Sequence, residues 1–162
     1  MMDFKQNVYV KKTKHKGKSV FANKLFKKGE FIFLIAGPIV TKGTIYTIPI
    51  TKGLWIDPAP VDNLGKYLCH SCDPNAGIKQ RTRVVAFKNI KKDEEIAIDY
   101  AMIVYKYGNE ISKESLICKC GSKNCRGELG SWSKLPKKIK EKYKGFVSEY
   151  LLHKKVERKR KI

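Results

Sequence analysis

The chain has 162 residues and carries 35 Lys and Arg side chains against 15 Asp and Glu, a formal net charge of +20. Hydrophobic residues make up 42% of the chain, which excludes a disordered polycation and predicts one domain with one core. The longest apolar run, residues 31–36, is too short to cross a bilayer, and the N-terminus lacks an apolar signal-peptide core. We therefore expect a soluble intracellular protein with no membrane partner, in the cytoplasm or nucleoid, or in the nucleus of a eukaryote.

The positive charge is concentrated at the two ends of the chain. Residues 1–28 carry +8 and residues 134–162 carry +9, which leaves +3 for the middle. Basic ends favour nonspecific contact with nucleic acid, so a zinc-containing nucleic-acid-binding module is one hypothesis for the chain. However, 30 of the 35 basic residues are Lys, whereas Arg is preferred for bidentate phosphate contacts. A solvated basic face is the alternative.

Short β-rich runs separated by Gly and Pro follow one another along most of the chain. We predict strands at residues 7–12, 19–22, 30–35, 44–50, 54–56, 83–87 and 96–98, and a helical turn within 59–67. Many short strands without a repeating helical pattern predict an irregular, mainly β fold with short helices.

From Pro136 onwards, apolar residues recur at helical spacing. The residues that form this stripe are Ile139, Tyr143, Phe146, Val147, Tyr150 and Leu151. They predict a C-terminal amphipathic helix that packs its apolar face on the domain rather than on a partner. Gly145, in the middle of the stripe, is expected to weaken or split this helix.

Five cysteines, an odd number in an intracellular setting, favour a metal site over disulfides. Cys118, Cys120 and Cys125 form a C-x-C-x4-C run that can wrap one metal ion. Structural zinc takes four ligands, so the fourth must come from Cys69 or Cys72, and their spacing does not distinguish the two. Free thiols are one alternative. A redox pair at Cys69 and Cys72 is less favoured because no β-α-β pattern surrounds it.

Three ordered motifs resemble those of the SET-domain protein-lysine methyltransferases. They are His70-Ser-Cys-Asp-Pro-Asn75, Asp93-Glu-Glu-Ile-Ala-Ile-Asp-Tyr100 and the C-x-C-x4-C run, which is similar to the family's post-SET zinc motif. Residues 46–50 and 55–57 look like the family's insert region, and residues 16–20 look like its N-terminal Gly-x-Gly loop. The tail is similar to that of short stand-alone prokaryotic or archaeal members.

The resemblance implies a SET-domain β-clip fold with a knot-like crossing, in which the chain after the His-Ser-Cys motif threads beneath an earlier loop. It divides the chain into a SET domain at 1–117, a post-SET zinc-binding segment at 118–130 and a basic C-terminal helix and tail at 131–162. It implies S-adenosylmethionine as methyl donor and a lysine of a histone-like or other DNA-associated basic protein as acceptor. It also implies a structural zinc ion with Cys72 as the fourth ligand, beside Cys118, Cys120 and Cys125.

The resemblance also implies roles for single residues. Tyr100 is the expected catalytic tyrosine, because its hydroxyl would orient the lysine amine and polarise the donor methyl group. Tyr100 and Ile98 would line the substrate-lysine channel, and Ile98 predicts room for di- or trimethylated products. The residues expected to bind the donor are Lys16, Gly17, Lys18, Tyr46, Cys69, His70 and Lys119.

Three residues depart from the family pattern. Cys69 stands where the family has the motif Asn, and a thiol is a weak hydrogen-bond partner. Losing one hydrogen bond to a charged group costs about 1.5–3 kcal/mol, so a SET-like protein that binds without turnover is a third hypothesis. Ser19 and Asp93 replace glycines. The turn at Ser19 must therefore avoid positive φ or accept strain, and we expect only local consequences at Asp93.

Overall fold

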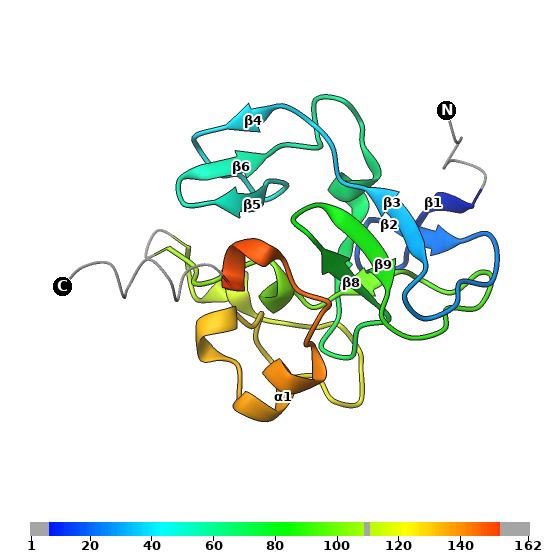
Figure 1. Cartoon of the computed structure of the whole chain (residues 1–162). Helices are drawn as coiled ribbons and strands as arrows, with labels where there is room; N and C mark the ends of the chain where they lie inside the picture. Colours follow the sequence, from blue (N-terminus) through cyan, green and yellow to red (C-terminus); the bar gives the residue numbers. More distant parts are fainter. Residues whose placement is uncertain (1–6, 109–110, 153–162) are drawn as a thin grey trace.

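The computed structural model describes residues 7–108 and 111–152, and its backbone is mainly β (Figure 1). The strands are β1 (Val8–Lys12), β2 (Lys18–Ala22), β3 (Phe31–Leu34), β4 (Ile39–Val40), β5 (Ile48–Thr51), β6 (Leu54–Ile56), β7 (Cys69–His70), β8 (Ala76–Lys79), β9 (Arg83–Ala86) and β10 (Ala97–Ile98). The helical elements are the 3-10 turns η2 (Leu64–Tyr67), η3 (Tyr100–Met102), η4 (Glu114–Leu116) and η5 (Trp132–Lys134), and the α-helix α1 (Lys137–Lys142). This architecture confirms the expected fold class.

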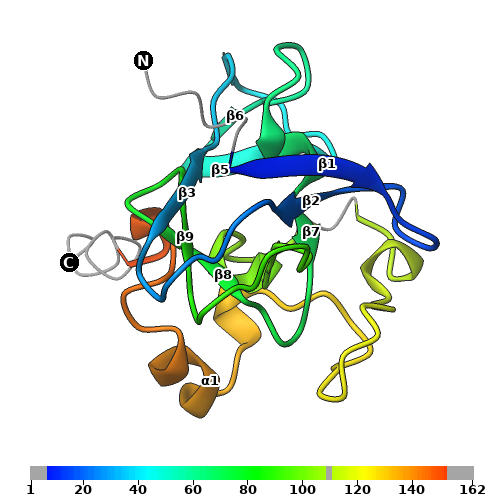
Figure 2. The same ribbon diagram turned by 90° about the vertical axis from the view of Figure 1, so that its right-hand side faces the viewer.

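The described strands form four small sheets. β1 and β2 make an antiparallel hairpin, β3-β9-β8 and β4-β6-β5 are three-stranded, and β7 pairs in parallel with β10. Figure 1 shows β4-β6-β5 as a lobe at the top and α1 at the bottom, and Figure 2 shows the hairpin crossing the side of the molecule. The parallel pair sets Cys69 opposite Ala97 and His70 opposite Ile98, so the two central motifs lie side by side.

One hydrophobic core joins most of these elements. It contains Phe26, Ile32, Ile78, Ile90, Ile98 and Met102, and also Tyr143, Val147 and Leu151 from the C-terminal segment. These last three residues are only 1%, 4% and 2% exposed. The apolar stripe therefore packs on the domain, as expected.

The predicted C-terminal helix is shorter and more interrupted than its apolar spacing indicated. α1 ends at Lys142, and Gly145 takes a φ of 81°, a left-handed conformation that stops the helix. Residues 149–152 are helical again, and the basic tail from residue 153 lies outside the described residues. None of the described helices has the length and apolar character that a membrane crossing needs.

The predicted strand at residues 44–50 is wrong in its first half. Residues 45–46 form a turn in which Thr47 Oγ1 accepts the Thr44 N–H at 2.8 Å and donates to the Thr44 carbonyl at 3.0 Å. These side-chain bonds compete with a strand ladder, so β5 begins only at Ile48. The other predicted strands are confirmed to within two residues, and the predicted helical turn is η2. The knot-like crossing and the three-part division of the chain stay predictions.

The close approach of β8 to the C-terminal segment generates a stability prediction. A Cβ at Gly77 would lie 2.8 Å from both Cβ and the carbonyl oxygen of Phe146. We expect Gly77→Ala to lower the free energy of unfolding by about 1–3 kcal/mol, the usual cost of overpacking. The measurement is urea denaturation, with Gly43→Ala as control, because the nearest atoms to a Cβ there are 3.4 Å away. Equal stability of the two variants would contradict this packing.

Candidate active site and metal centre

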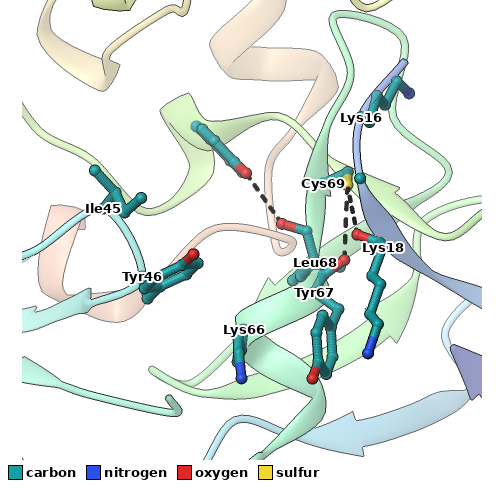
Figure 3. Close-up of a pocket in the computed structure, with 10 residues that line it drawn as sticks. Lys16, Lys18, Ile45, Tyr46, Lys66, Tyr67, Leu68 and Cys69 are labelled. Carbon is teal, nitrogen blue, oxygen red and sulfur yellow. Dashed lines mark hydrogen bonds between the residues drawn. The ribbon is translucent and has the colours of Figure 1, made fainter. Parts of the chain in front are cut away.

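A cavity of about 410 Å³ opens beside β2, η2 and β7 (Figure 3). Its volume lies in the range of small-molecule sites. The predicted site residues that line it are Lys16, Gly17, Lys18, Tyr46, Cys69 and Tyr100. The structure thus brings together residues from the N-terminal loop, the insert region and both central motifs. The lining residues that were not predicted are Ile45, Lys66, Tyr67 and Leu68.

Three of the residues predicted to contact the donor or the substrate do not line this cavity. Ile98 is fully buried in β10, Lys119 is exposed, and His70 lies behind Tyr100 with its ring centroid 5.1 Å from that of the tyrosine. Their predicted roles toward donor and substrate stay predictions.

Tyr100 is held at the cavity wall by its hydroxyl group. The hydroxyl donates to the Leu68 carbonyl oxygen at 3.0 Å, and the Tyr100 backbone N–H donates to Nδ1 of His70 at 3.1 Å. Burial raises the pKa of the Tyr100 phenol above its ordinary value, so the group stays protonated. Because its proton is directed at the Leu68 carbonyl, the phenol oxygen has lone pairs available to accept a hydrogen bond from another group.

Cations surround the mouth of the cavity. Lys16 Nζ pairs with Glu95 Oε2 at 3.1 Å, whereas the ammonium groups of Lys18 and Lys66 lie 5.7 Å and 5.1 Å from the centroid of the Tyr67 ring. Glu95 therefore offsets the charge of Lys16, and Asp62, whose Oδ1 lies 3.3 Å from Lys66 Nζ, offsets that of Lys66, whereas Lys18 forms no ion pair within the described residues. The arrangement favours a ligand with an anionic group, such as a carboxylate.

The two glycine replacements have different local consequences. Ser19 lies in β2 without a positive φ, and its hydroxyl donates to Glu95 Oε1 at 2.7 Å, so no strain arises there. Asp93 takes a φ of 65°, the left-handed region that a glycine adopts freely and Asp tolerates. The Cys69 thiol faces the carbonyl oxygens of Tyr67 and Lys18 at 3.7 Å and 3.9 Å, and burial raises its pKa.

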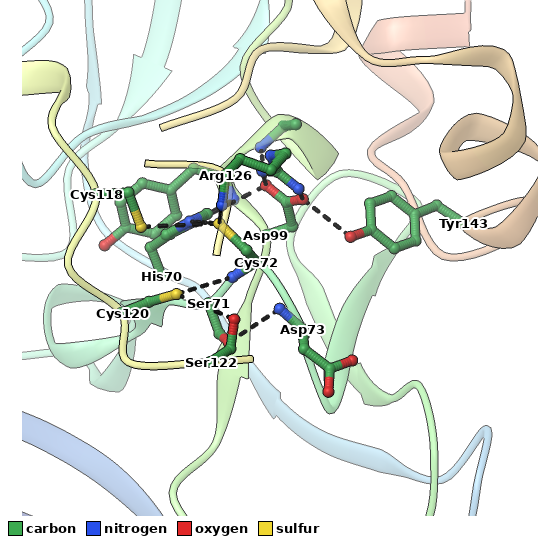
Figure 4. Close-up of polar contacts among 12 residues, drawn as sticks. His70, Ser71, Cys72, Asp73, Asp99, Cys118, Cys120, Ser122, Arg126 and Tyr143 are labelled. Atoms are coloured by element: carbon green, nitrogen blue, oxygen red, sulfur yellow. Dashed lines mark hydrogen bonds and ion pairs between the residues drawn. The ribbon is translucent and has the colours of Figure 1, made fainter. Parts of the chain in front are cut away.

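A second cluster brings together sulfur and nitrogen atoms of cysteine and histidine side chains (Figure 4). Ligand atoms of His70, Cys72, Cys118 and Cys120 all lie within 4.8 Å of one another. Three of these residues are predicted zinc ligands. The fourth predicted ligand, Cys125, is outside this group, and its Sγ lies 3.6 Å from the Cys118 carbonyl oxygen.

The hydrogen bonds of His70 argue against direct metal ligation by this residue. Burial lowers the pKa of His70 to about 4, so the ring is neutral near pH 7. Its Nδ1 accepts the Tyr100 N–H, so the single ring proton sits on Nε2, which lies 3.3 Å from Cys72 Sγ. A protonated nitrogen has no lone pair for a metal, and His70 instead donates to the Cys72 sulfur.

The donor set suits a metal held by thiolates. Backbone N–H groups of Arg126 and Cys72 donate to the sulfurs of Cys72 and Cys120 at 3.4 Å and 3.5 Å. Such outer hydrogen bonds orient metal ligands and stabilise the negative charge on sulfur. The residues present therefore fit a structural zinc ion.

Asp99 connects the cavity and the cysteine cluster with the C-terminal segment. Its carboxylate is fully buried, and it accepts hydrogen bonds from Arg126 at 2.7 Å and 2.9 Å and from the Tyr143 hydroxyl at 2.9 Å. Neither Asp99 nor Arg126 was predicted as a site residue. The available signals were the position of Asp99 directly before Tyr100 and that of Arg126 directly after the last cysteine.

Comparisons with known proteins find the same domain in other chains. Residues 17–101, more than half of the chain, match the model of the SET domain. A histone-lysine N-methyltransferase, H3 lysine-36 specific, from Yarrowia lipolytica is 32% identical over 146 residues, covering 76% of this chain and 18% of that protein. Histone-lysine N-methyltransferase ASHR3 from Arabidopsis thaliana is 29% identical, covering 81% and 29%. The chain spans less than a third of the length of these relatives.

Solved structures show the same fold. The crystal structure of KRYPTONITE in complex with mCHG DNA and SAH superimposes with a TM-score of 0.62 at 22% identity, covering 76% of this chain and 29% of that chain. The methyltransferase domain of human histone-lysine N-methyltransferase SETMAR gives a TM-score of 0.57 at 22% identity, covering 76% and 58%.

The buried ion pair of Asp99 generates a second stability prediction. Asp99→Asn keeps the shape of the side chain but leaves the Arg126 guanidinium without its counter-charge. We expect the free energy of unfolding to fall by about 3–5 kcal/mol, the range for breaking a buried pair. Asp93→Asn is the control, because Asp93 accepts an exposed hydrogen bond from Tyr9 and its positive φ suits Asn. Denaturation curves that shift equally for both variants would contradict the prediction.

Proposed function

The chain belongs to the SET-domain family, and on that premise we propose that it transfers methyl groups from S-adenosylmethionine to the ε-amine of a lysine in a protein. The observation that carries the proposal is the cavity that Tyr100 lines together with residues of the N-terminal loop and the insert region. The names of the relatives, which are histone-lysine N-methyltransferases, support the same reaction. So does a solved polycomb complex of the same fold that is bound to S-adenosylmethionine.

S-adenosylmethionine, when bound, supplies an electrophilic methyl group on a sulfonium. Lys18, with Lys16 beside it, would receive the carboxylate of the donor at the mouth of the cavity. Gly17 has a φ of 72° and open space where a Cβ would stand, so the backbone between the two lysines can approach the donor closely. Tyr46 would cover the donor from the insert region. The thiol of Cys69 would form weaker hydrogen bonds with this donor than the side-chain amide of the family's Asn would.

The lysine amine must be neutral to attack the methyl group. At pH 7 the neutral form of a free lysine lies about 4.6 kcal/mol uphill, and a desolvated channel next to a sulfonium reduces this cost. Tyr100 would orient the amine, because its oxygen keeps lone pairs free while its proton is held by the Leu68 carbonyl. Alignment and electrostatics then supply the rate enhancement without a strong base. Room for di- or trimethylated products beside Ile98 stays a prediction, because this side chain is buried in β10 and does not line the cavity.

The basic charge of the chain bears on the substrate. A protein with a net charge of +20 repels a basic substrate in free solution. We propose a histone-like or other basic protein that is bound to DNA or RNA, because the polyanion masks the charge of the substrate. The site of action would be a nucleoid, or a chromosome in a eukaryote. The relatives reported above are eukaryotic, so kinship with short prokaryotic or archaeal members rests on the tail alone.

We also propose that Cys72, Cys118, Cys120 and Cys125 hold one structural zinc ion. Support comes from the short Cys72–Cys118 sulfur distance of 3.7 Å, from the N–H donors around the sulfurs, and from the tautomer of His70. The ion would tie the segment at 118–125 to the strand that carries His70. A structural zinc contributes about 10–16 kcal/mol of apparent binding free energy to such a segment.

The catalytic assignment predicts that Tyr100→Phe abolishes most turnover. Removing one group that stabilises a transition state costs about 10²–10³-fold in kcat. We expect a loss of that size in the transfer of labelled methyl groups to proteins of a native cell extract. Donor affinity, measured by calorimetry, should change by less than about threefold, because the ring remains. Tyr9→Phe, which removes a hydroxyl that makes an exposed hydrogen bond, is the control. Unchanged turnover in Tyr100→Phe would refute the assignment.

The zinc assignment predicts one equivalent of zinc per chain after dialysis. Cys125→Ser should lose most of this zinc, because three thiolates do not complete a tetrahedral site. His70→Asn should retain it, with affinity lowered about 10–100-fold by the lost outer hydrogen bond. Cys69→Ser is the matched control. The zinc content of each variant is measured by mass spectrometry of the metal. The proposed ligand set would be overturned if Cys125→Ser retained its zinc while His70→Asn or Cys69→Ser lost it.

A further inference from the structure

We infer that Tyr143, in the C-terminal segment outside the matched SET region, positions Tyr100 through the buried carboxylate of Asp99. The inference rests on the proposed function only in taking Tyr100 as the residue that meets the substrate. It assigns to the C-terminal segment a role in the active site, beyond the packing of its apolar stripe.

The carboxylate of Asp99 is saturated with donors. Arg126 donates one hydrogen bond to each oxygen, the Tyr143 hydroxyl donates to Oδ2, and the Ala101 N–H donates to Oδ1 at 3.0 Å. A buried carboxylate offers about four acceptor positions, and here four are used. Loss of the Tyr143 hydroxyl would therefore leave an acceptor that is closed to water, and the carboxylate would turn or shift to recover a partner.

The orientation of Asp99 determines where Tyr100 lies. Asp99 is the N-cap of η3, the single turn that begins at Tyr100, and it holds that turn through the Ala101 N–H. On the other side, the Tyr100 N–H is fixed by His70 Nδ1. The peptide that carries Tyr100 is thus held from two directions, and a rotated Asp99 would move the phenol that meets Leu68.

The C-terminal segment holds η3 at its other end as well. The Ser148 N–H donates to the carbonyl oxygen of Met102, the last residue of η3, at 2.9 Å. Tyr143 is 1% exposed, and its ring meets Phe87 edge-on with centroids 5.7 Å apart. A rigid, packed residue therefore presents the hydroxyl to Asp99, and the C-terminal segment contacts both ends of the turn that carries the active-site tyrosine.

The test is Tyr143→Phe, which removes one hydroxyl and keeps the ring against Phe87. Amide hydrogen exchange reports the position of Tyr100 directly, through its bond to His70. We expect exchange at the Tyr100 amide to become at least about tenfold faster, while the Ile90 amide, bonded to the Phe26 carbonyl at 2.9 Å in the core, keeps its rate. Turnover should fall by about 10- to 100-fold in kcat, with donor affinity and KM changed by less than about threefold.

Tyr9→Phe is a closely matched control. Tyr9 also donates its hydroxyl to an Asp, at 2.9 Å, but on the exposed surface. This variant should leave both exchange rates and turnover unchanged. If Tyr143→Phe fails to fold, Arg126→Lys, which keeps the charge and loses the fork of two donors, replaces it with the same expected local effect.

Two results would overturn the inference. One is an unchanged Tyr100 exchange rate in Tyr143→Phe. The other is equal acceleration at Tyr100 and Ile90, which would show a general loss of stability rather than a displaced turn. The exchange measurement needs no methyl transfer, so it tests the inference independently of activity. If the unaltered protein bound no S-adenosylmethionine, that finding would refute the proposed function but not the inference about Tyr143.

Discussion

A charge that is fully removed from water must be matched by hydrogen-bond donors within the protein, and the buried carboxylate of Asp99 is such a charge. Its donors come from residues 27 and 44 positions further along the chain. The cysteine-rich segment and the C-terminal segment therefore have to converge on the strand that precedes Tyr100. This convergence brings the C-terminal segment and the cysteine-rich segment to the turn that carries Tyr100.

The parallel pairing of β7 with β10 gives the site its second constraint. It sets His70 beside Ile98, so that one imidazole lies between the backbone of Tyr100 and the sulfur of Cys72. A single neutral ring can serve both neighbours because one nitrogen accepts and the other donates. The proposed catalytic tyrosine and the proposed zinc centre are thus connected through the same short pair of strands, β7 and β10.

Local patterns in the sequence predicted most of what is local in the structure. Apolar alternation located seven of the ten described strands but missed β4, β7 and β8, two of which have only two residues. The family resemblance as a whole, including its N-terminal loop and insert region, located six of the ten residues that line the cavity. The turn at Thr44–Thr47 escaped prediction because side-chain hydrogen bonds outweigh an apolar alternation there. The bonds from Arg126 and Tyr143 to Asp99 escaped it because no periodicity links residues so far apart. Likewise, the placement of His70 beside Cys72 depends on ring hydrogen bonds that spacing does not encode.

The saturated carboxylate has a consequence for how much of the chain folds on its own. The region that defines family membership, residues 17–101, contains Asp99 but only one of its donors, the Ala101 amide. In a fragment that ended at residue 101, the Asp99 carboxylate would lack its hydrogen bonds from the Arg126 guanidinium and the Tyr143 hydroxyl. We therefore expect the autonomous folding unit of this protein to extend at least to Leu151, a core residue well beyond the segment by which its family is recognised.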